Sequence, residues 1–281
     1  MKVLTMRNDC SPIEPLRVSG VEPALFSFYA FAQDTIIGVQ VDRPIYEFHP
    51  LELDEARDFL SVQELAAVYL NYIFKIQQRG PYLLCGYSFG GLVAYEIATL
   101  LEKEGKEIGL LALFDTSHPQ FSRNISVIEL ARFRVTYLTN RFLKYGKNLM
   151  YGKLSNIKAD VLQFIIPRLR TIAWRVTRAA FRTANRPVPR IMRRETQAVA
   201  TAWRTYTPGT CTNRLVLFRV EDRGVEYNRD MTLGWRACVT SDIEVHVVPG
   251  RHEDMMKKPY VHVLVEKLNS YLAGIGNRHS P

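Results

Sequence analysis

The sequence has few of the features that mark membrane-spanning, secreted or zinc-binding proteins. No stretch of its 281 residues is long and uncharged enough to cross a bilayer, and the N-terminus lacks the apolar run of a signal peptide. The four cysteines lie far apart, without a C-x-x-C pair or a Cys/His cluster, so we expect neither a disulfide framework nor a zinc site. These absences favour a reduced, cytoplasmic protein that holds no metal and no cofactor of its own.

Acidic residues are scarce in one long segment. Between Pro119 and Arg204 there are three acids against 18 Lys and Arg, a surplus of 15 positive charges in a chain whose formal net charge is +9. The rest of the chain therefore has a net negative charge. The segment reads as basic amphipathic helices with no strand between them, so we interpret residues 119–194 as an insertion. Residues 1–118 and 195–281 are predicted to form the core.

Outside this segment, short apolar runs alternate with longer stretches of helical period, which is typical of a parallel sheet covered by helices. Six runs are apolar enough to be strands buried on both faces: Ala24–Phe28, Pro44–Phe48, Tyr82–Gly86, Ile108–Phe114, Leu215–Val220 and Ile243–Val248. Three stretches have the apolar spacing of helices that pack on a sheet: Val62–Gln78, Gly91–Glu104 and Tyr260–Ala273. A further helix is expected to begin near Arg194.

The motif G-x-S-x-G occurs at residues 86–90, between a predicted strand and a predicted helix. In this context the serine lies on a sharp turn with its hydroxyl exposed, which makes Ser88 the candidate nucleophile. A side chain at Gly86 or Gly90 would collide with the opposing strand or helix. We therefore expect an α/β-hydrolase fold, a mostly parallel central sheet with helices on both faces, in which the insertion forms a helical lid over the active site.

A serine nucleophile needs a general base and an acid that orients the base, and in this fold the chain order is serine, acid, histidine. His252 is the best placed of the six histidines, because it follows the last predicted strand in a tight loop, whereas His49 precedes the serine. Two acids are candidates. Asp115 ends one apolar strand and Asp222 follows the next, and the pattern alone does not separate them.

Two stretches closely match a known family. Gly80-Pro-Tyr-Leu-Leu-Cys-Gly-Tyr-Ser-Phe-Gly-Gly-Leu-Val-Ala-Tyr-Glu-Ile-Ala with Leu111-Ala-Leu-Phe-Asp-Thr, and Val248-Pro-Gly-Arg-His-Glu-Asp-Met-Met, resemble the thioesterase domains that release products from nonribosomal peptide and polyketide synthetases. The similarity runs from about Glu22 to Leu272, outside the insertion. In that family the acid follows the strand after the nucleophile helix, so the resemblance favours Asp115.

The resemblance implies a serine thioesterase that acts on an acyl or peptidyl carrier protein or synthetase. Ser88 attacks a thioester on the phosphopantetheinyl arm of the carrier, and water or an internal nucleophile releases the acyl chain by hydrolysis or cyclisation. His252 takes the serine proton and returns it to the leaving thiolate. One oxyanion donor is expected to be the N–H of Phe89, and we place the second at Ala30, in the loop after the first core strand.

That loop departs from the family pattern. Members usually have a Gly-containing turn and then a helix, whereas here the turn reads Tyr-Ala-Phe-Ala and only Gln33–Arg43 precedes the next strand. Two alternatives therefore stay open: a general carboxylesterase or lipase-like hydrolase, and a catalytically degenerate carrier- or membrane-binding module. Because the chain begins with methionine and shows no carrier domain, we expect a free-standing protein, with an excised C-terminal domain as the alternative.

The basic insertion suggests which partners to expect. Carrier proteins are generally acidic, so a basic lid beside the active site would steer them electrostatically. Peripheral contact with an anionic membrane is an alternative, because apolar residues interleave with arginines between Phe164 and Arg178. No nucleic-acid-binding motif is found, which makes nucleic acid the weakest of the three hypotheses.

Overall fold

The computed structural model describes residues 12–20, 23–30, 41–51, 61–121, 195–223 and 229–276, with the single residues 135, 139, 183 and 227. The chain divides into two compact units, one of residues 1–124 and 199–281 and the other of residues 125–198. The basic insertion expected over 119–194 falls almost entirely outside the described residues, so its helices and its role as a lid stay predictions.

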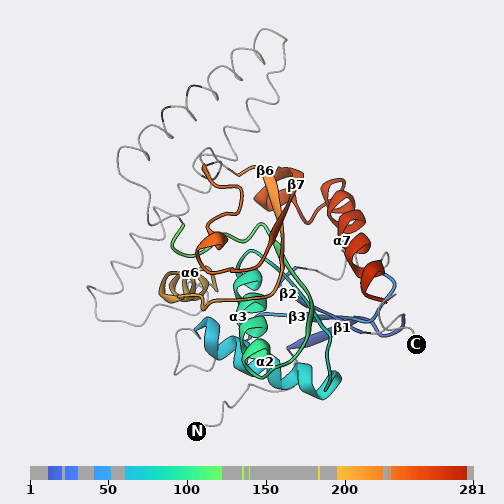
Figure 1. The fold of residues 1–281 in the computed structure, drawn as a ribbon. Coiled ribbons are helices and arrows are strands. Elements are labelled where there is room, and N and C mark those ends of the chain that lie inside the picture. Colours follow the sequence, from blue (N-terminus) through green and yellow to red (C-terminus); the bar gives the residue numbers. More distant parts are fainter. Residues whose placement is uncertain are drawn as a thin grey trace. The chain divides into compact units, whose positions relative to one another are not determined.

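Seven strands of the first unit form one sheet in the order β1-β3-β2-β4-β5-β6-β7 (Figure 1). In chain order they are β1 (Ile13–Arg17), β2 (Leu25–Phe28), β3 (Ile45–Phe48), β4 (Tyr82–Tyr87), β5 (Ile108–Phe114), β6 (Leu215–Asp222) and β7 (Ile243–Arg251). Each neighbouring pair is parallel except β1 with β3, which is antiparallel. The carboxyl ends of β2 to β7 therefore meet at one edge of the sheet, where ligands bind in folds of this kind.

Helices cover both faces of the sheet. Helices α2 (Val62–Ile76) and α3 (Phe89–Lys103) pack on one face, and α7 (Tyr260–Gly276) packs on the other (Figure 1). Helix α2 begins with a capping box, in which Ser61 and Glu64 each accept a hydrogen bond from the other's backbone N–H. Helix α6 (Glu195–Thr205) lies between β5 and β6 in the chain. Tyr206, the residue after α6, donates its hydroxyl to the buried carboxylate of Glu96 on α3 at 2.7 Å.

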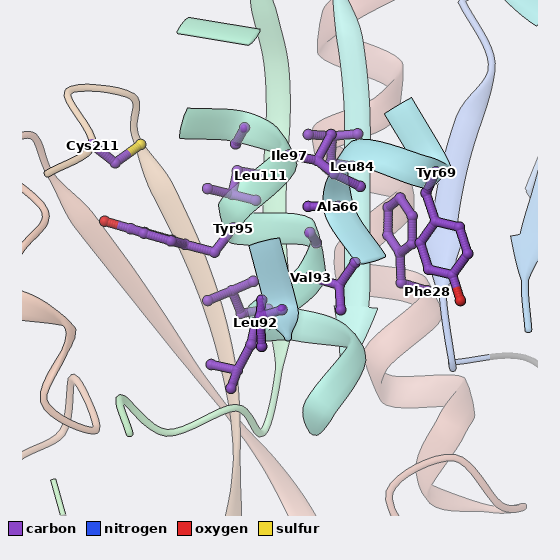
Figure 2. Packing of buried hydrophobic residues seen from close by; sticks show 14 of the residues in the cluster. Phe28, Ala66, Tyr69, Leu84, Leu92, Val93, Tyr95, Ile97, Leu111 and Cys211 are labelled. Carbon is purple, nitrogen blue, oxygen red and sulfur yellow. The ribbon is translucent and has the colours of Figure 1, made fainter. Parts of the chain in front are cut away.

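The face under α2 and α3 is filled with large apolar side chains (Figure 2). Residues from five strands, β2 to β6, and from both helices meet there, among them Phe28, Leu84, Leu111, Ala66, Tyr69, Val93 and Ile97. Phe28 stacks on Phe48 with ring centroids 4.8 Å apart, and Tyr69 lies 5.0 Å from the same ring. Burying an aromatic or aliphatic side chain of this size stabilises the fold by roughly 1.5–3 kcal/mol. This packing holds β2, β4 and β5 in place, and the candidate site lies at the carboxyl ends of β4, β5 and β7.

The predicted fold class is confirmed. All six predicted strands and the three predicted core helices are present, and their ends differ from the prediction by no more than three residues. The helix expected near Arg194 is α6. Strand β1, five residues with Pro15 in the middle, was not predicted, because proline argues against a strand except at the edge of a sheet, where β1 lies. Among the described residues, no helix has the length and apolar character needed to cross a membrane.

Candidate active site

Ser88 lies on a strained turn between β4 and α3. Its backbone angles are φ 53° and ψ −114°, in a region that residues other than glycine rarely adopt. The Ser88 N–H donates to the carbonyl oxygen of Phe114 at 2.9 Å, which ties the turn to the end of β5. Such strain persists only where neighbouring elements hold the backbone in place, and it is concentrated at functional sites.

Two glycines allow this turn to pack tightly. A Cβ at Gly86 would lie 2.4 Å from the carbonyl oxygen of Gly90, and a Cβ at Gly90 would lie 2.0 Å from the carbonyl oxygen of Phe28 on β2. Both contacts are far shorter than any real Cβ makes, and both are with backbone that cannot move aside cheaply. The expected collision of any side chain at these positions is therefore confirmed.

His252 bridges Ser88 and Asp115. Its Nε2 lies 3.0 Å from Ser88 Oγ, and its Nδ1 lies 2.6 Å from Asp115 Oδ2. The histidine directly follows β7 and begins the short 3-10 helix η4 (His252–Asp254), after Gly250 has turned the chain at φ 96°. Its side chain is 29% exposed. With Nδ1–H donated to the carboxylate, Nε2 is left as the acceptor that faces the serine hydroxyl.

The two candidate acids lie in opposite environments. Asp115 is fully buried at the end of β5, with φ 46°, and its Oδ1 accepts the N–H of Val220 at 3.1 Å. Asp222 at the end of β6 has a side chain that is 62% exposed, and it accepts from Arg251 Nε at 3.1 Å. Of the two acids, Asp115 is the one within hydrogen-bond distance of His252.

The other described histidines have different partners. His49 lies 2.7 Å from Glu14, and His246 lies 3.2 Å from Glu244. His118 is buried, its Nδ1 accepts the N–H of Gln120 at 3.2 Å, and burial lowers its pKa. His262 is an exposed residue of α7. The tail residue His279 lies outside the described part of the chain.

The two predicted oxyanion donors differ in their surroundings. Phe89 is the first residue of α3, so its N–H has no acceptor within the helix and lies next to the nucleophile. The Ala30 N–H, in contrast, donates to the buried carboxylate of Glu47 at 2.9 Å. To serve as an oxyanion donor, Ala30 would have to release this carboxylate. Both assignments stay predictions, and the loop residues 31–40 lie outside the described part of the chain.

Two residues missed in the sequence contact the histidine or the acid. Tyr87 stacks on His252 with ring centroids 4.9 Å apart, and its hydroxyl donates to the His252 backbone carbonyl. Burial raises the pKa of the Tyr87 hydroxyl, so it remains a donor. Arg223 Nη1 lies 3.2 Å from Asp115 Oδ1. Tyr87 is part of the G-x-S-x-G motif and could have been singled out from the sequence. Nothing in the sequence shows that Arg223, 108 positions after Asp115, contacts Asp115 in the fold.

A metal-dependent site is not indicated in the part of the chain that the structure covers. Among the described residues, no three His, Cys, Asp or Glu side chains come together in a group that could hold a metal ion.

A family model described as a thioesterase domain matches residues 40–271. The chain belongs to the thioesterase domain family. The resemblance inferred from the sequence is thereby confirmed.

The relatives of this thioesterase domain among known proteins include large synthetases. The nonribosomal peptide synthetase btyA of Aspergillus terreus is 26% identical over 278 residues, which cover 92% of this chain and 29% of the synthetase. The atromentin synthetase of Tapinella panuoides is 34% identical over 115 residues, which cover 38% of this chain and 12% of the synthetase. The chain therefore spans less than a third of the length of either relative.

Solved structures show the same fold. A four-domain nonribosomal peptide synthetase bound to AMP and glycine has a TM-score of 0.63 and 21% identity, covering 92% of this chain and 20% of the synthetase. The NocB thioesterase domain, in covalent complex with a fluorophosphonate nocardicin G analogue, has a TM-score of 0.57 and 17% identity, covering 92% of this chain and 99% of that domain.

Proposed function

We propose that this chain is a serine thioesterase that releases an acyl or peptidyl chain from the phosphopantetheinyl arm of a carrier protein, through an acyl-serine intermediate. The observation that carries the proposal is the bridge made by His252 between Ser88 Oγ, at 3.0 Å, and Asp115 Oδ2, at 2.6 Å. Nucleophile, base and orienting acid in this contact pattern are what acyl transfer through serine requires.

In the first half of the reaction, Ser88 Oγ attacks the thioester carbonyl carbon while His252 Nε2 accepts the hydroxyl proton. The imidazolium that forms keeps its Nδ1–H bond to Asp115, whose buried carboxylate stabilises the positive charge. The thioester carbonyl oxygen becomes an oxyanion. We assign the Phe89 N–H as one of its donors, and each such donor is worth about 3 kcal/mol in other hydrolases. When the C–S bond breaks, the thiolate takes the proton from His252.

In the second half, the acyl-serine ester is cleaved. His252 Nε2 is neutral again and accepts a proton from water, or from a hydroxyl or amine of the acyl chain itself, as that group attacks the ester carbonyl. Ser88 leaves and recovers its proton from His252. Attack by water gives hydrolysis, whereas attack by a group of the acyl chain gives a cyclic product.

The expected partner is a carrier protein, either within a synthetase or separate from it. This part of the proposal rests on the relatives, which are synthetases of much greater length than the chain. Resemblance alone does not decide activity, because one relative is named an inactive atromentin synthetase. That protein is 31% identical over 111 residues, which cover 37% of this chain and 12% of the synthetase. The proposal of a working enzyme therefore rests on the geometry around His252.

The first test is labelling of the purified protein with a fluorophosphonate probe, read by intact mass. We expect one probe per molecule in the wild-type protein and none in Ser88→Ala or His252→Ala. Two matched controls should label like the wild type: Ser270→Ala, which removes an exposed serine of α7, and His246→Ala, which removes the neighbouring histidine of β7. A folded wild-type protein that does not label would overturn the assignment and favour a non-catalytic binding module.

The second test asks about the leaving group. The same acyl chain is offered as a carrier-bound phosphopantetheine thioester and as an oxygen ester, and kcat/KM is compared. We expect a preference for the carrier-bound thioester. A protein that labels at Ser88 but prefers the oxygen ester is a general carboxylesterase, which would contradict the thioesterase part of the proposal while leaving the catalytic residues in place.

A further inference from the structure

The buried carboxylate of Asp115 has a second charged neighbour besides His252. Arg223 follows the last residue of β6, and its Nη1 lies 3.2 Å from Asp115 Oδ1. The Arg223 side chain is only 10% exposed and that of Asp115 is fully buried, so water screens this ion pair weakly. The guanidinium also lies over the ring of Tyr227, 4.6 Å from its centroid, which restricts its position.

The two oxygens of Asp115 have separate partners. Oδ2 faces His252 Nδ1 at 2.6 Å, whereas Oδ1 accepts the Val220 N–H at 3.1 Å and pairs with Arg223. The contact with Arg223 is an ion pair and not an aligned hydrogen bond. Its main effect on the site is therefore electrostatic: a positive charge sits on the side of the carboxylate away from the histidine.

We propose that Arg223 is a positioning residue of the active site, which holds Asp115 and offsets its negative charge so that His252 stays a neutral base at lower pH. This inference rests on the proposed function of His252. A carboxylate next to an imidazole favours the protonated imidazolium, and a cation on the same carboxylate weakens that preference. A general base must be neutral to accept the serine proton, so Arg223 extends the working range of the enzyme on its acid side.

Other charged and titratable groups also act on this cluster. They come from β4, β6, the segment after β6 and η4, and they are Tyr87, Arg219, Tyr227, Asp230, Glu253 and Asp254. Burial lowers the pKa of Arg219, and the negative charge of Asp115 raises it in opposition. Because substitution of Arg223 removes none of these groups, a comparison of Gln and Lys at that position tests the charge of Arg223 itself.

The test is the pH profile of kcat/KM for Arg223→Gln and Arg223→Lys. We expect the acid limb of the profile to move to higher pH by about 0.5–1 unit in Arg223→Gln, because the cation near the carboxylate is gone. Lysine keeps the charge, so Arg223→Lys should return the limb to within about 0.3 unit of the wild type. The matched control is Arg251→Gln, which removes a 42% exposed arginine that pairs with Asp222, and which should leave the limb unchanged.

An NMR titration of the His252 imidazole in the same proteins needs no turnover and separates this inference from the proposed function. We expect its midpoint to rise in Arg223→Gln and to stay near the wild-type value in Arg223→Lys, even in a protein that fails to label with fluorophosphonate. Thermal unfolding identifies any variant that does not fold. If Arg223→Gln does not fold, the titration midpoint of Arg223→Lys is compared with that of the wild type. Equal midpoints in the wild type and folded Arg223→Gln, or equal shifts in the Gln and Lys variants, would overturn the proposal.

Discussion

The carboxyl ends of β5 and β6 each carry an aspartate after an apolar strand, yet the two residues have little else in common. Asp115 is fully buried, and it contacts His252, Arg223 and the Val220 N–H. Asp222, in the neighbouring strand, has a side chain that is 62% exposed, and it pairs with an arginine whose side chain is 42% exposed. The difference shows that a position at the carboxyl edge of the sheet is not enough to make a carboxylate the orienting acid. The carboxylate must also be buried next to the histidine.

The largest expected effect comes from exchanging each aspartate for its amide. Asp115→Asn should lower kcat/KM by about 10,000-fold, the loss found when the orienting carboxylate of a serine protease becomes an amide, because the imidazole loses its correct tautomer. Asp222→Asn should change kcat/KM by less than about twofold, since surface ion pairs contribute little. Steady-state kinetics on a thioester substrate measures both. A large loss in Asp222→Asn with normal activity in Asp115→Asn would reverse the comparison.

The tight packing at the end of β5 should make the free energy of unfolding sensitive to added atoms there. A Cβ at Gly91 would lie 2.0 Å from Oγ1 of Thr116, the residue after Asp115, and that hydroxyl donates to the Ser88 carbonyl oxygen at 2.9 Å. We expect Gly91→Ala to lower the free energy of unfolding by about 1–3 kcal/mol through overpacking. Gly209→Ala is the control, because a Cβ there meets no atom within 4 Å. Urea unfolding of both variants tests this, and equal stability would contradict it.

A smaller effect is expected from Tyr87, which holds the histidine from the side of β4. Tyr87→Phe keeps the stacking on His252 but removes the hydrogen bond to its carbonyl oxygen, worth about 1 kcal/mol. If that energy serves to hold the catalytic geometry, kcat/KM falls about fivefold. Tyr72→Phe on α2 makes the same change outside the site and should leave kcat/KM unchanged. A loss as large as that of Asp115→Asn would mean that the hydroxyl has a chemical role.

The smallest effect is expected for the stability contribution of Asp222. Its ion pair with Arg251 joins two side chains that are 62% and 42% exposed, so Asp222→Asn should lower the free energy of unfolding by at most about 1 kcal/mol. The wild-type protein in high salt should show a similar small loss from this pair, because salt screens exposed charges. A loss of several kcal/mol would contradict this prediction and show that the exposed end of β6 contributes as much to stability as the buried end of β5.

The apolar runs and their spacing were enough to predict the strands and helices of the core. The G-x-S-x-G motif predicted a turn with a serine at its apex, because glycine is required on both sides of so sharp a connection. The edge strand β1 was missed, since it has Pro15 in its middle and lacks the alternation of a half-buried strand. The partner of the Ala30 N–H was also missed. A glutamate in an otherwise apolar strand was a visible anomaly, but the sequence does not say which backbone group Glu47 meets.

The sequence by itself determined the order of the chemical groups along the chain: a serine on a turn after one strand, carboxylates after two others and a histidine after the last. These follow from local patterns, because a strand, a turn or a helix is specified by residues that are neighbours in the chain. Only the tertiary structure decided which carboxylate faces His252 and which cation faces that carboxylate. Asp115, Arg223 and His252 come from the ends of three different strands, and their distances depend on how those strands pair in the sheet.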